Sequence, residues 1–512
     1  MVKVHIVVFS RIVTRRIQCD FPYLVKINDF PTLFKYPPLD YAKMAHKSLV
    51  RPNNLSLGEA DELSPLDQYM IRIIIPVMCI FQIDSKELRP TIVANLKAGL
   101  ARTIDEMPFI ACVIVPDDQE RGTMKLIFDG EETGIWFYEQ ELPEYDYESL
   151  AKRRFSFADF PITDFVPEPR GHSEKSPVIT VLVTFIKGGL VMTFNGHHAV
   201  MDAQSLGTFV TVWSRNVLSV SEGLTVPPKE RFNAEDLDRT GMSSAFSARP
   251  LQDYPTYQPG AECLFGDRRD EIIHLSVSGD HSKLKEMVPI SHWVMSQAAV
   301  ETLNRSVSEA FPKEPGVTEA ALISALIWRN ISIARGLLSK GASGSALFTS
   351  MNVRRMLDPQ LAMTYPGNAI ALARADASSK ELNSDKELRT LYLLARRISD
   401  SIEWWTPEQL WDLAGTIHES QNVENLMLPN LDNSFYISQP ARFGDLLGKS
   451  QWGTEMGAIK SIRFAFAPPV DGFACSLPAL TGGLDLMIWI DPMVQARLKT
   501  TKEWTKWVEE VK

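Results

Sequence analysis

The stretch 178–217 constrains the fold of this 512-residue chain more than any other part of its sequence. The segments 178–186 and 190–194 are rich in β-formers, and a Lys-Gly-Gly turn separates them, so we predict a β-hairpin. In 203–217 the apolar residues recur at helical spacing. The chain must therefore fold so that a hairpin leads directly into a helix.

Two adjacent histidines, His197 and His198, lie between this hairpin and this helix. The dipeptide Asn195-Gly196 precedes them and is predicted to break the second strand. Asp202 completes a His-x-x-x-Asp pattern with His198. A junction of strand and helix is a place where a rigid scaffold can present a reactive side chain, so this pattern marks the first candidate site.

The rest of the sequence alternates between strand and helix patterns and has no internal repeat. One strongly periodic helix is predicted between the N-cap Thr318 and Gly336, where it stops. Further strands are predicted at 70–83, 109–115, 272–276, 473–477 and 484–490, and further helices at 90–104, 281–287 and 492–511. This alternation predicts an α/β or mixed α+β fold in two large halves.

A long segment with little periodicity, 218–266, is rich in Pro, Ser, Gly and Asp. Connections of this length are uncommon inside a compact domain, so we place a crossover there. The expected division is an N-terminal domain 1–217 that carries the His-x-x-x-Asp pattern, a crossover linker 218–270 and a C-terminal domain 271–512.

Composition narrows the class of protein. The chain has 53 Lys+Arg against 63 Asp+Glu, and its net charge of −10 argues against a nucleic-acid binder. Its five cysteines are odd in number and form no CxxC pair, so neither a structural metal site nor a disulfide framework is expected. No run of about twenty apolar residues is present. We therefore expect a soluble cytoplasmic protein that does not enter a membrane.

His198 is the candidate catalytic residue. The imidazole of histidine has a pKa of about 6.5, so its neutral form can take a proton from an alcohol and return it to a leaving group. No Gly-x-Ser-x-Gly pattern supplies a nucleophile, so direct transfer to an acceptor activated by His198 is favoured. A buried histidine satisfied by the backbone stays an equal alternative on this pattern alone. His197 is expected to be structural, because adjacent strand residues point to opposite faces and do not share a metal.

Four motifs occur in order between 63 and the end of the chain. They are Leu63-Ser64-Pro65-Leu66-Asp67-Gln68, the His-His-x-x-x-Asp pattern, Asn352-Val353-Arg354-Arg355 with Pro359 and Tyr365-Pro366-Gly367-Asn368, and Gln451-Trp452-Gly453-Thr454-Glu455-Met456-Gly457. Together they resemble the BAHD acyltransferases, most closely the fungal branch of the trichothecene 3-O-acetyltransferase type. The third match is partial, because Met356 stands where the family has a second arginine. The resemblance implies two similar chloramphenicol-acetyltransferase-like domains with a channel between them.

The resemblance also implies roles for single residues. His198 matches the general base, which deprotonates the acceptor hydroxyl for attack on an acyl-CoA thioester. Asp202 matches an aspartate that turns away from the site and pairs with an arginine; spacing alone would let it orient the imidazole, and we favour the structural role. Arg354 matches an arginine that in the family also pairs with the first residue of the 451–457 loop.

That loop departs from the family at its first residue, since the usual Asp is Gln451 here. An amide hydrogen bond is then the most that can replace the ion pair with the arginine, and it is the weaker interaction. Trp452, Gly453 and Gly457 still match and are expected to support the site through packing and backbone geometry. The sequence does not identify the oxyanion donor, for which Thr454 or a backbone N–H near Trp452 are candidates.

The resemblance implies acyl-CoA, most commonly acetyl-CoA, as co-substrate and a hydroxylated fungal secondary metabolite as acceptor, with no permanently bound cofactor. Because coenzyme A carries phosphates, basic residues are expected at one channel mouth. A monomer that binds neither nucleic acid nor membrane is expected.

Two other functions stay open. A stand-alone condensation domain shares the His-His-x-x-x-Asp pattern and the two-domain fold and would use a carrier-protein thioester, although Ala203 stands where such domains usually have Gly. A catalytically inactive relative that acts as a binding protein is suggested by Gln451.

Overall fold

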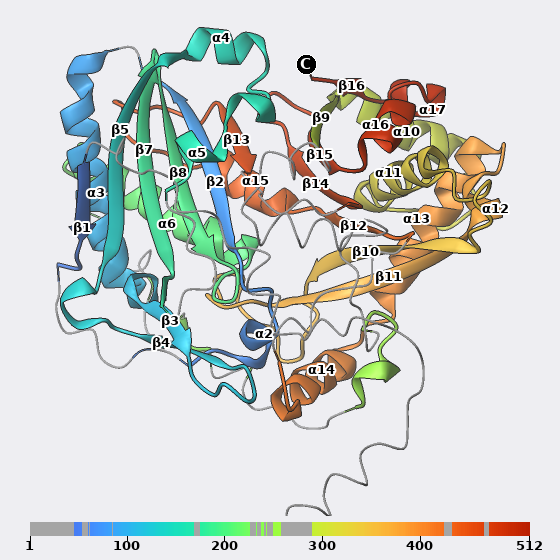
Figure 1. Ribbon diagram of the computed structural model, residues 1–512, viewed down its shortest axis with the longest axis horizontal. Coiled ribbons are helices and arrows are strands. Elements are labelled where there is room, and N and C mark those ends of the chain that lie inside the picture. The colour runs from blue at the N-terminus through green and yellow to red at the C-terminus, as the bar shows by residue number, and fades with distance from the viewer. Residues whose placement is uncertain are drawn as a thin grey trace, which may run out of the picture.

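Two large β-sheets, each covered by helices, make up most of the computed structural model (Figure 1). The structure describes residues 46–53, 60, 62–83, 85–167, 175–225, 232, 237–239, 242, 249–257, 289–423, 433–464 and 471–511. Strands and helices alternate along the chain, so the mixed α/β class predicted from the sequence is confirmed.

The first sheet has six strands in the order β1-β5-β7-β8-β2-β13. They are β1 (His46–Val50), β2 (Ile74–Gln82), β5 (Ile135–Asp146), β7 (Ile179–Lys187), β8 (Gly189–His197) and β13 (Ser461–Phe464). One face of this sheet packs on α6 (Ala203–Ser221), which in turn packs on α3 (Arg89–Glu106). The other face carries α4 (Tyr147–Lys152) and α5 (Ile162–Phe165).

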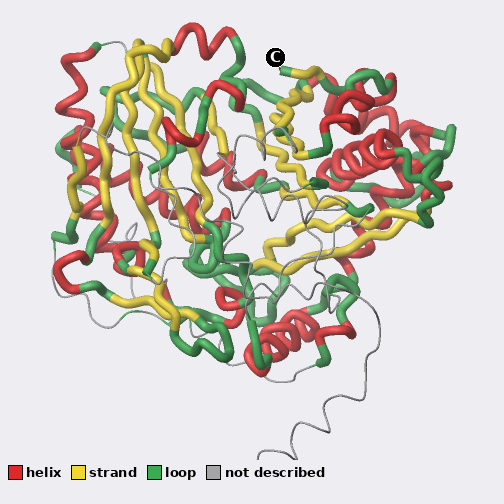
Figure 2. The backbone as a smooth tube through the Cα atoms, viewed as in Figure 1, coloured by secondary structure: helices red, strands yellow, loops and turns green. Residues whose placement is uncertain are grey.

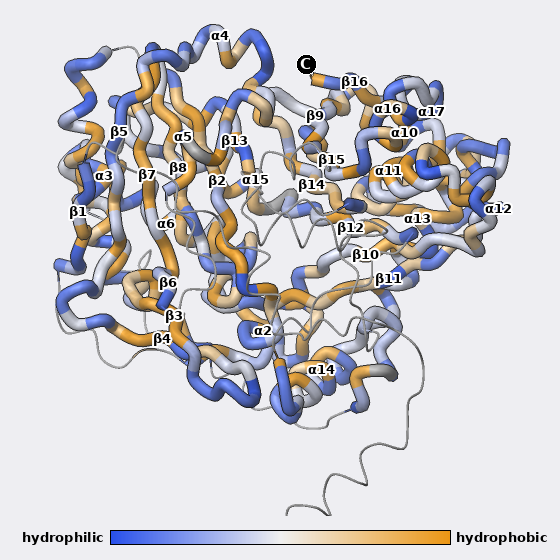
Figure 3. Tube along the Cα trace, in the orientation of Figure 1, coloured by the Kyte–Doolittle hydropathy of each residue, from blue (hydrophilic) through white to orange (hydrophobic). Residues whose placement is uncertain are grey.

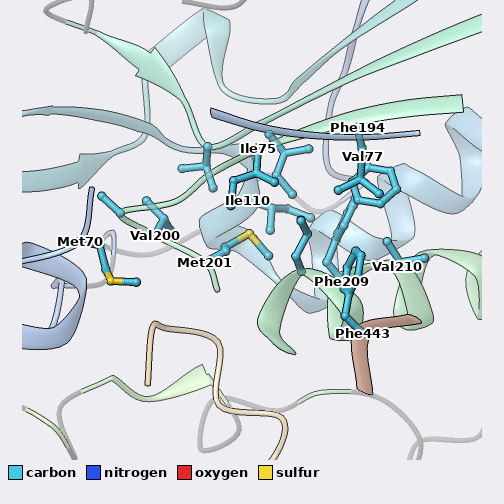
Figure 4. Close-up of a cluster of buried hydrophobic side chains, with 14 of the residues drawn as sticks. Met70, Ile75, Val77, Ile110, Phe194, Val200, Met201, Phe209, Val210 and Phe443 are labelled. Atoms are coloured by element: carbon cyan, nitrogen blue, oxygen red, sulfur yellow. The ribbon is translucent and has the colours of Figure 1, made fainter. Parts of the chain in front are cut away.

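The core between this sheet and α6 is apolar and closely packed (Figure 4). Ile75 and Val77 of β2 lie beside Phe194 of β8, and Phe209 of α6 packs edge-on against Phe194 with ring centroids 6.1 Å apart. Phe443 closes the cluster from α15 (Ala441–Gly448). Burial of each such side chain stabilises the fold by about 1.5–3 kcal/mol.

The second sheet has seven strands in the order β11-β10-β12-β14-β15-β9-β16. They are β9 (Ile290–Met295), β10 (Gly344–Asn352), β11 (Ile370–Ser378), β12 (Phe435–Ser438), β14 (Phe473–Pro478), β15 (Leu484–Trp489) and β16 (Glu509–Glu510). A group of helices gathers over this sheet (Figure 2). These are α10 (Gln297–Ala310), α11 (Glu319–Arg335), α12 (Ser379–Leu382), α13 (Glu387–Glu403), α16 (Pro492–Leu498) and α17 (Lys502–Thr505).

A third, small sheet lies beside the first and has the order β4-β3-β6. Its strands are β3 (Val113–Pro116), β4 (Met124–Ile127) and β6 (Ser176–Pro177). Two helices, α2 (Pro65–Gln68) and α14 (Pro407–Glu419), contact each other near the junction of the two large sheets. Figure 3 shows hydrophobic residues along the strands of both large sheets and hydrophilic residues on outer segments such as α12.

The predicted hairpin is present as β7 and β8, but the predicted strand break at Asn195-Gly196 is wrong. The strand β8 continues to His197, because Gly196 pairs with both Ile75 and Ile179 on its two neighbouring strands. A Cβ at Gly196 would lie 2.9 Å from Leu206, so this glycine serves close helix-to-sheet packing.

Other local predictions have mixed outcomes. Helix α11 has the expected Thr318 N-cap and ends at Gly336, which adopts a left-handed conformation, and the hairpin of β14 and β15 is present. The strand predicted at 109–115 begins only at Val113, after a short 3₁₀ turn. The single final helix is wrong, because two short helices and β16 occupy that segment. The strand at 272–276 and the helix at 281–287 lie outside the described residues.

The strand β13 crosses from the second half of the chain into the first sheet, where it pairs antiparallel with β2. Arg463 of β13 then meets Asp485 of β15 at 3.1 Å, and His292 of β9 meets the same carboxylate at 2.8 Å. The first sheet thus takes a strand from the predicted C-terminal domain. The division into 1–217, 218–270 and 271–512 stays a prediction.

Candidate active site

His198 lies in a tight turn between β8 and α6. Its N–H donates to the carbonyl of Ile73 at 2.8 Å, and the N–H groups of Val200 and Met201 both donate to the carbonyl of His197. The side chains of Val200 and Met201 are buried in the core beneath the turn (Figure 4). Hydrogen bonds and apolar anchors therefore fix the backbone that carries the imidazole.

Asp202 ends this turn and begins α6. Its Oδ1 accepts the N–H of Ser205 at 2.9 Å, which is the N-cap hydrogen bond of the helix. The same carboxylate binds Arg354 through both oxygens, at 2.7 and 3.1 Å, and Oδ2 also accepts the N–H of Ala369 at 3.0 Å. The pairing of Asp202 with an arginine, predicted from the resemblance, is present.

A second buried ion pair lies on the other side of the turn. Asp67, in α2, meets Arg239 at 3.0 Å, and both side chains are almost fully excluded from solvent. Arg239 also donates to the carbonyl of Val200 at 3.1 Å. The turn that carries His198 is therefore held between two ion pairs, Asp202 with Arg354 and Asp67 with Arg239.

Two consecutive residues link these pairs. The N–H of Asn368 donates to Asp67 at 2.7 Å, and the N–H of Ala369 donates to Asp202. The side chain of Asn368 bridges Asp67 and the carbonyl of His198, at 2.8 and 2.9 Å. Three of the four motifs named from the sequence thus meet at the N-terminal end of α6.

Burial controls the charges of the site. It lowers the pKa of His198 below its ordinary value, although the residue's own backbone, the Asp202 carboxylate and the Asn368 side chain oppose this shift. Burial alone would raise the pKa of Asp202, but the Arg354 guanidinium and the N–H groups of Ala369 and Ser205 bring it below its ordinary value. The site therefore holds a neutral imidazole beside an ionised carboxylate near neutral pH.

The fourth motif, 451–457, lies elsewhere. Trp452 packs edge-on against Phe81 and Trp213, at 5.9 and 5.1 Å between ring centroids. Gly453 lies against Ser221, the last residue of α6, whereas His198 precedes the first. Since α6 has 19 residues, about 28 Å of helix separate its ends.

This placement bears on two expectations for the loop. Thr454 follows Gly453, which lies at the far end of α6 from His198, and its role as an oxyanion or substrate contact stays a prediction. Gln451 is exposed. The side chain of Arg354 donates to Asp202, as described above, and also to the side-chain oxygen of Asn352 and to the carbonyls of Tyr365 and Gly367. Trp452, Gly453 and Gly457 shape the loop at a distance from the imidazole.

The sequence did not point to Asn368, Asp67 or Arg239 as site residues. Asp67 and Asn368 stood inside recognised motifs, and their place in those motifs was the signal available. Arg239 lies in the aperiodic crossover segment, where no pattern marks it. Its partner Asp67 is 172 positions away, so the pair becomes visible in the fold alone.

Within the described part of the chain, no three His, Cys, Asp or Glu side chains gather as metal ligands. None of the helices described there is both long enough and apolar enough to cross a membrane.

Comparisons with known proteins identify what the chain is similar to. The model of a family described as the Transferase family matches residues 43–404. The chain is 24% identical to Acyltransferase easC of Emericella nidulans, over 88% of this chain and 95% of that protein. It is 22% identical to Trichothecene 3-O-acetyltransferase TRI101 of Fusarium sporotrichioides, over 86% and 94%. The crystal structure of F. graminearum TRI101 with coenzyme A and deoxynivalenol has the same fold, with a TM-score of 0.74 at 18% identity over 88% of this chain and 100% of that chain.

Proposed function

This chain belongs to the Transferase family, the BAHD acyltransferases, and from that premise we propose that it moves an acyl group from acyl-CoA to a hydroxyl group, with His198 as general base. The observation that carries the proposal is the half-buried, neutral imidazole of His198 in a turn held by two ion pairs. A neutral imidazole accepts a proton, and a fixed one accepts it from a defined position.

The reaction follows from this position. His198 takes the proton of the acceptor hydroxyl as its oxygen attacks the thioester carbonyl carbon. A tetrahedral oxyanion forms, and it collapses with cleavage of the carbon–sulfur bond. The thiolate of coenzyme A leaves and receives the proton from His198, so the base is regenerated with each turnover. The donor that stabilises the oxyanion is not assigned, and one good donor contributes about 3–4 kcal/mol.

The relatives support the choice of substrates. The relative from F. sporotrichioides is named Trichothecene 3-O-acetyltransferase TRI101, and the structure of F. graminearum TRI101 contains coenzyme A and deoxynivalenol. We accordingly propose acetyl-CoA as donor and a hydroxylated fungal secondary metabolite as acceptor, without a permanently bound cofactor. A cytoplasmic monomer is proposed as well; the buried thiols of Cys79 and Cys475, which form no disulfide, fit a reducing compartment.

The experiment combines purified protein, acetyl-CoA and a panel of hydroxylated acceptors, with release of free thiol and formation of ester both measured. Transfer without any carrier protein is expected, and a strict need for a carrier would instead support a condensation-type domain. His198→Ala should lower kcat about 10²–10⁴-fold. The exposed His418→Ala is the matched control and should retain wild-type rates.

Two results would contradict the proposal. Unchanged transfer by His198→Ala would exclude His198 as the base. Absence of transfer by the wild type to every acceptor, with binding of those acceptors retained, would favour an inactive binding protein. In a strain that lacks the protein, a free alcohol should accumulate and its ester should be missing.

A further inference from the structure

We infer that Asn368 is a positioning residue for His198. Asn368 holds the main-chain carbonyl of His198 and thereby fixes the imidazole, and Asp67 holds Asn368 in place for this purpose. The inference rests on the proposed function of His198 and extends it to Asn368 and Asp67, which the sequence did not mark as site residues.

The amide of Asn368 joins two groups that are otherwise unconnected. Its Nδ2 donates to the carbonyl oxygen of His198 at 2.9 Å and to Oδ1 of Asp67 at 2.8 Å. Both hydrogens of the amide are therefore used, one in each direction. The side chain of Asn368 has no exposed surface, so water does not compete for either hydrogen bond.

Asp67 fixes the conformation of Asn368. Its Oδ1 accepts the main-chain N–H of Asn368 at 2.7 Å as well as the side-chain amide. Two hydrogen bonds from one residue to one oxygen allow few rotamers of that residue. The other oxygen, Oδ2, accepts the N–H and the hydroxyl of Ser64 at 3.0 and 2.9 Å and meets Arg239 at 3.0 Å. The side chain of Asp67 is therefore also held in one position.

The same carboxylate reaches the turn by a second route. Arg239 donates from one nitrogen to Asp67 and to the carbonyl of Val200, two residues after His198. Asp67 thus controls two carbonyls of the turn, that of His198 through Asn368 and that of Val200 through Arg239. Asp202, which pairs with Arg354, accepts the N–H of Ala369, the residue after Asn368.

The carbonyl of His198 matters because it belongs to the residue that carries the imidazole, so the backbone that Asn368 holds also sets where the ring lies. A shift of this carbonyl would turn the ring away from the hydroxyl proton that it is to remove. A catalytic group must be held within about 0.5 Å and 10–20° of its productive geometry. Misplacement by about 1 Å can lower the rate about 10²-fold.

The test compares Asn368→Ala with Asn330→Ala. The first change removes the bridge to the His198 carbonyl but keeps the main-chain N–H that binds Asp67. Asn330, in α11, is also without exposed surface, and its Nδ2 also donates to a main-chain carbonyl, that of Leu326 at 2.9 Å. Asn330 lies in the other half of the protein, away from His198. Its replacement therefore measures the effect of losing a buried amide that does not contact the site.

We expect Asn368→Ala to lower kcat about 10–100-fold with the KM for acetyl-CoA changed by less than about twofold. The pKa of the His198 ring, measured by NMR, should fall further below its ordinary value, because Asn368 opposes the effect of burial. Asn330→Ala should change neither quantity. If Asn368→Ala does not fold, Asn368→Ser is measured by the same criteria.

Wild-type kcat in the folded Asn368 variant, or a loss no larger than that of Asn330→Ala, would overturn the inference. Full activity of His198→Ala would instead overturn the proposed function, and the ring pKa would still report whether Asn368 positions the imidazole. The two failures are therefore distinguishable.

Discussion

Asp202 binds Arg354 through both of its carboxylate oxygens, at 2.7 and 3.1 Å, with both side chains removed from solvent. This pair connects the turn after β8 to the segment after β10, which belong to different halves of the chain. The aspartate of the His-x-x-x-Asp pattern therefore ties the two halves together at the place where His198 stands.

Replacement of Asp202 by Asn should destabilise the protein by about 3–5 kcal/mol, because Arg354 would stay buried without a countercharge. The free energy of unfolding in urea measures this loss. The double variant Asp202→Ala with Arg354→Met should lose less than the sum of the two single changes, since no unpaired charge is left. A loss below about 1 kcal/mol for Asp202→Asn would show that the pair is not formed.

The acid limb of kcat/KM should lie below about pH 6.5, the ordinary pKa of histidine. The base acts when it is neutral, and burial lowers the pKa of His198, so the neutral form persists to more acidic pH. A pH–rate profile at saturating acetyl-CoA and varied acceptor measures the limb. A limb above pH 7 would be inconsistent with a base whose pKa is lowered.

Gly453→Ala should destabilise the protein more than Gly457→Ala. Both glycines have a positive φ, +84° and +66°, which costs about 1–2 kcal/mol for alanine. A Cβ at Gly453 would in addition overlap the Ser221 hydroxyl, whereas a Cβ at Gly457 meets nothing within 4 Å. We expect about 2–5 kcal/mol for the first and about 1–2 kcal/mol for the second.

Thermal or urea unfolding measures this difference. The kcat of the folded fraction should stay at the wild-type value in both variants, because the loop lies at the end of α6 opposite to His198. Equal losses of stability would show that Gly453 is not in contact with Ser221, and a selective loss of kcat would place the loop in the reaction after all.

His292→Asn should weaken the dependence of stability on pH. Burial lowers the pKa of His292, with Arg463 and Arg154 acting in the same direction and Asp485 against them. The unfolded chain then binds more protons than the folded one below about pH 6.5, so the wild type loses stability as the pH falls, by at most about 1.4 kcal/mol per pH unit for each such histidine.

Urea unfolding of wild type and variant between pH 7.5 and 5 tests this. The His292→Asn variant should have the smaller slope. Parallel curves for wild type and His292→Asn would mean that His292 is protonated in the folded state as readily as in the unfolded state.

Local signals in the sequence predicted local structure well. Thr318 has a side chain that caps a helix N-terminus, and Gly336 readily adopts the left-handed conformation that ends a helix, so α11 could be placed between them. The end of β8 could not be placed, because Asn195-Gly196 is held in the strand by partners on β2 and β7. Tertiary pairing there overrides the turn preference of the two residues.

The sequence predicted only part of the candidate site, because local signals place single residues but not their distant partners. The place of His198 at a strand–helix junction follows from neighbouring sequence, and the resemblance supplied an arginine partner for Asp202. The bond between Asp67 and Arg239 joins residues in segments that no local period connects. Whether Gln451 affects the reaction could not be judged from the sequence, because only the course of α6 shows how far its loop lies from the imidazole.

The strand β13 has a consequence for how this protein can be divided. Along Val77–Ile80, β2 is an apolar strand whose outer edge is paired by Ser461–Phe464 alone among the described residues. A fragment that ended before 461 would expose the N–H and C=O groups of that edge, and exposed apolar edges recruit strands of other molecules. We therefore expect the first half of the chain to aggregate when it is produced without β13. An exchange of halves between relatives should keep β13 together with the first sheet.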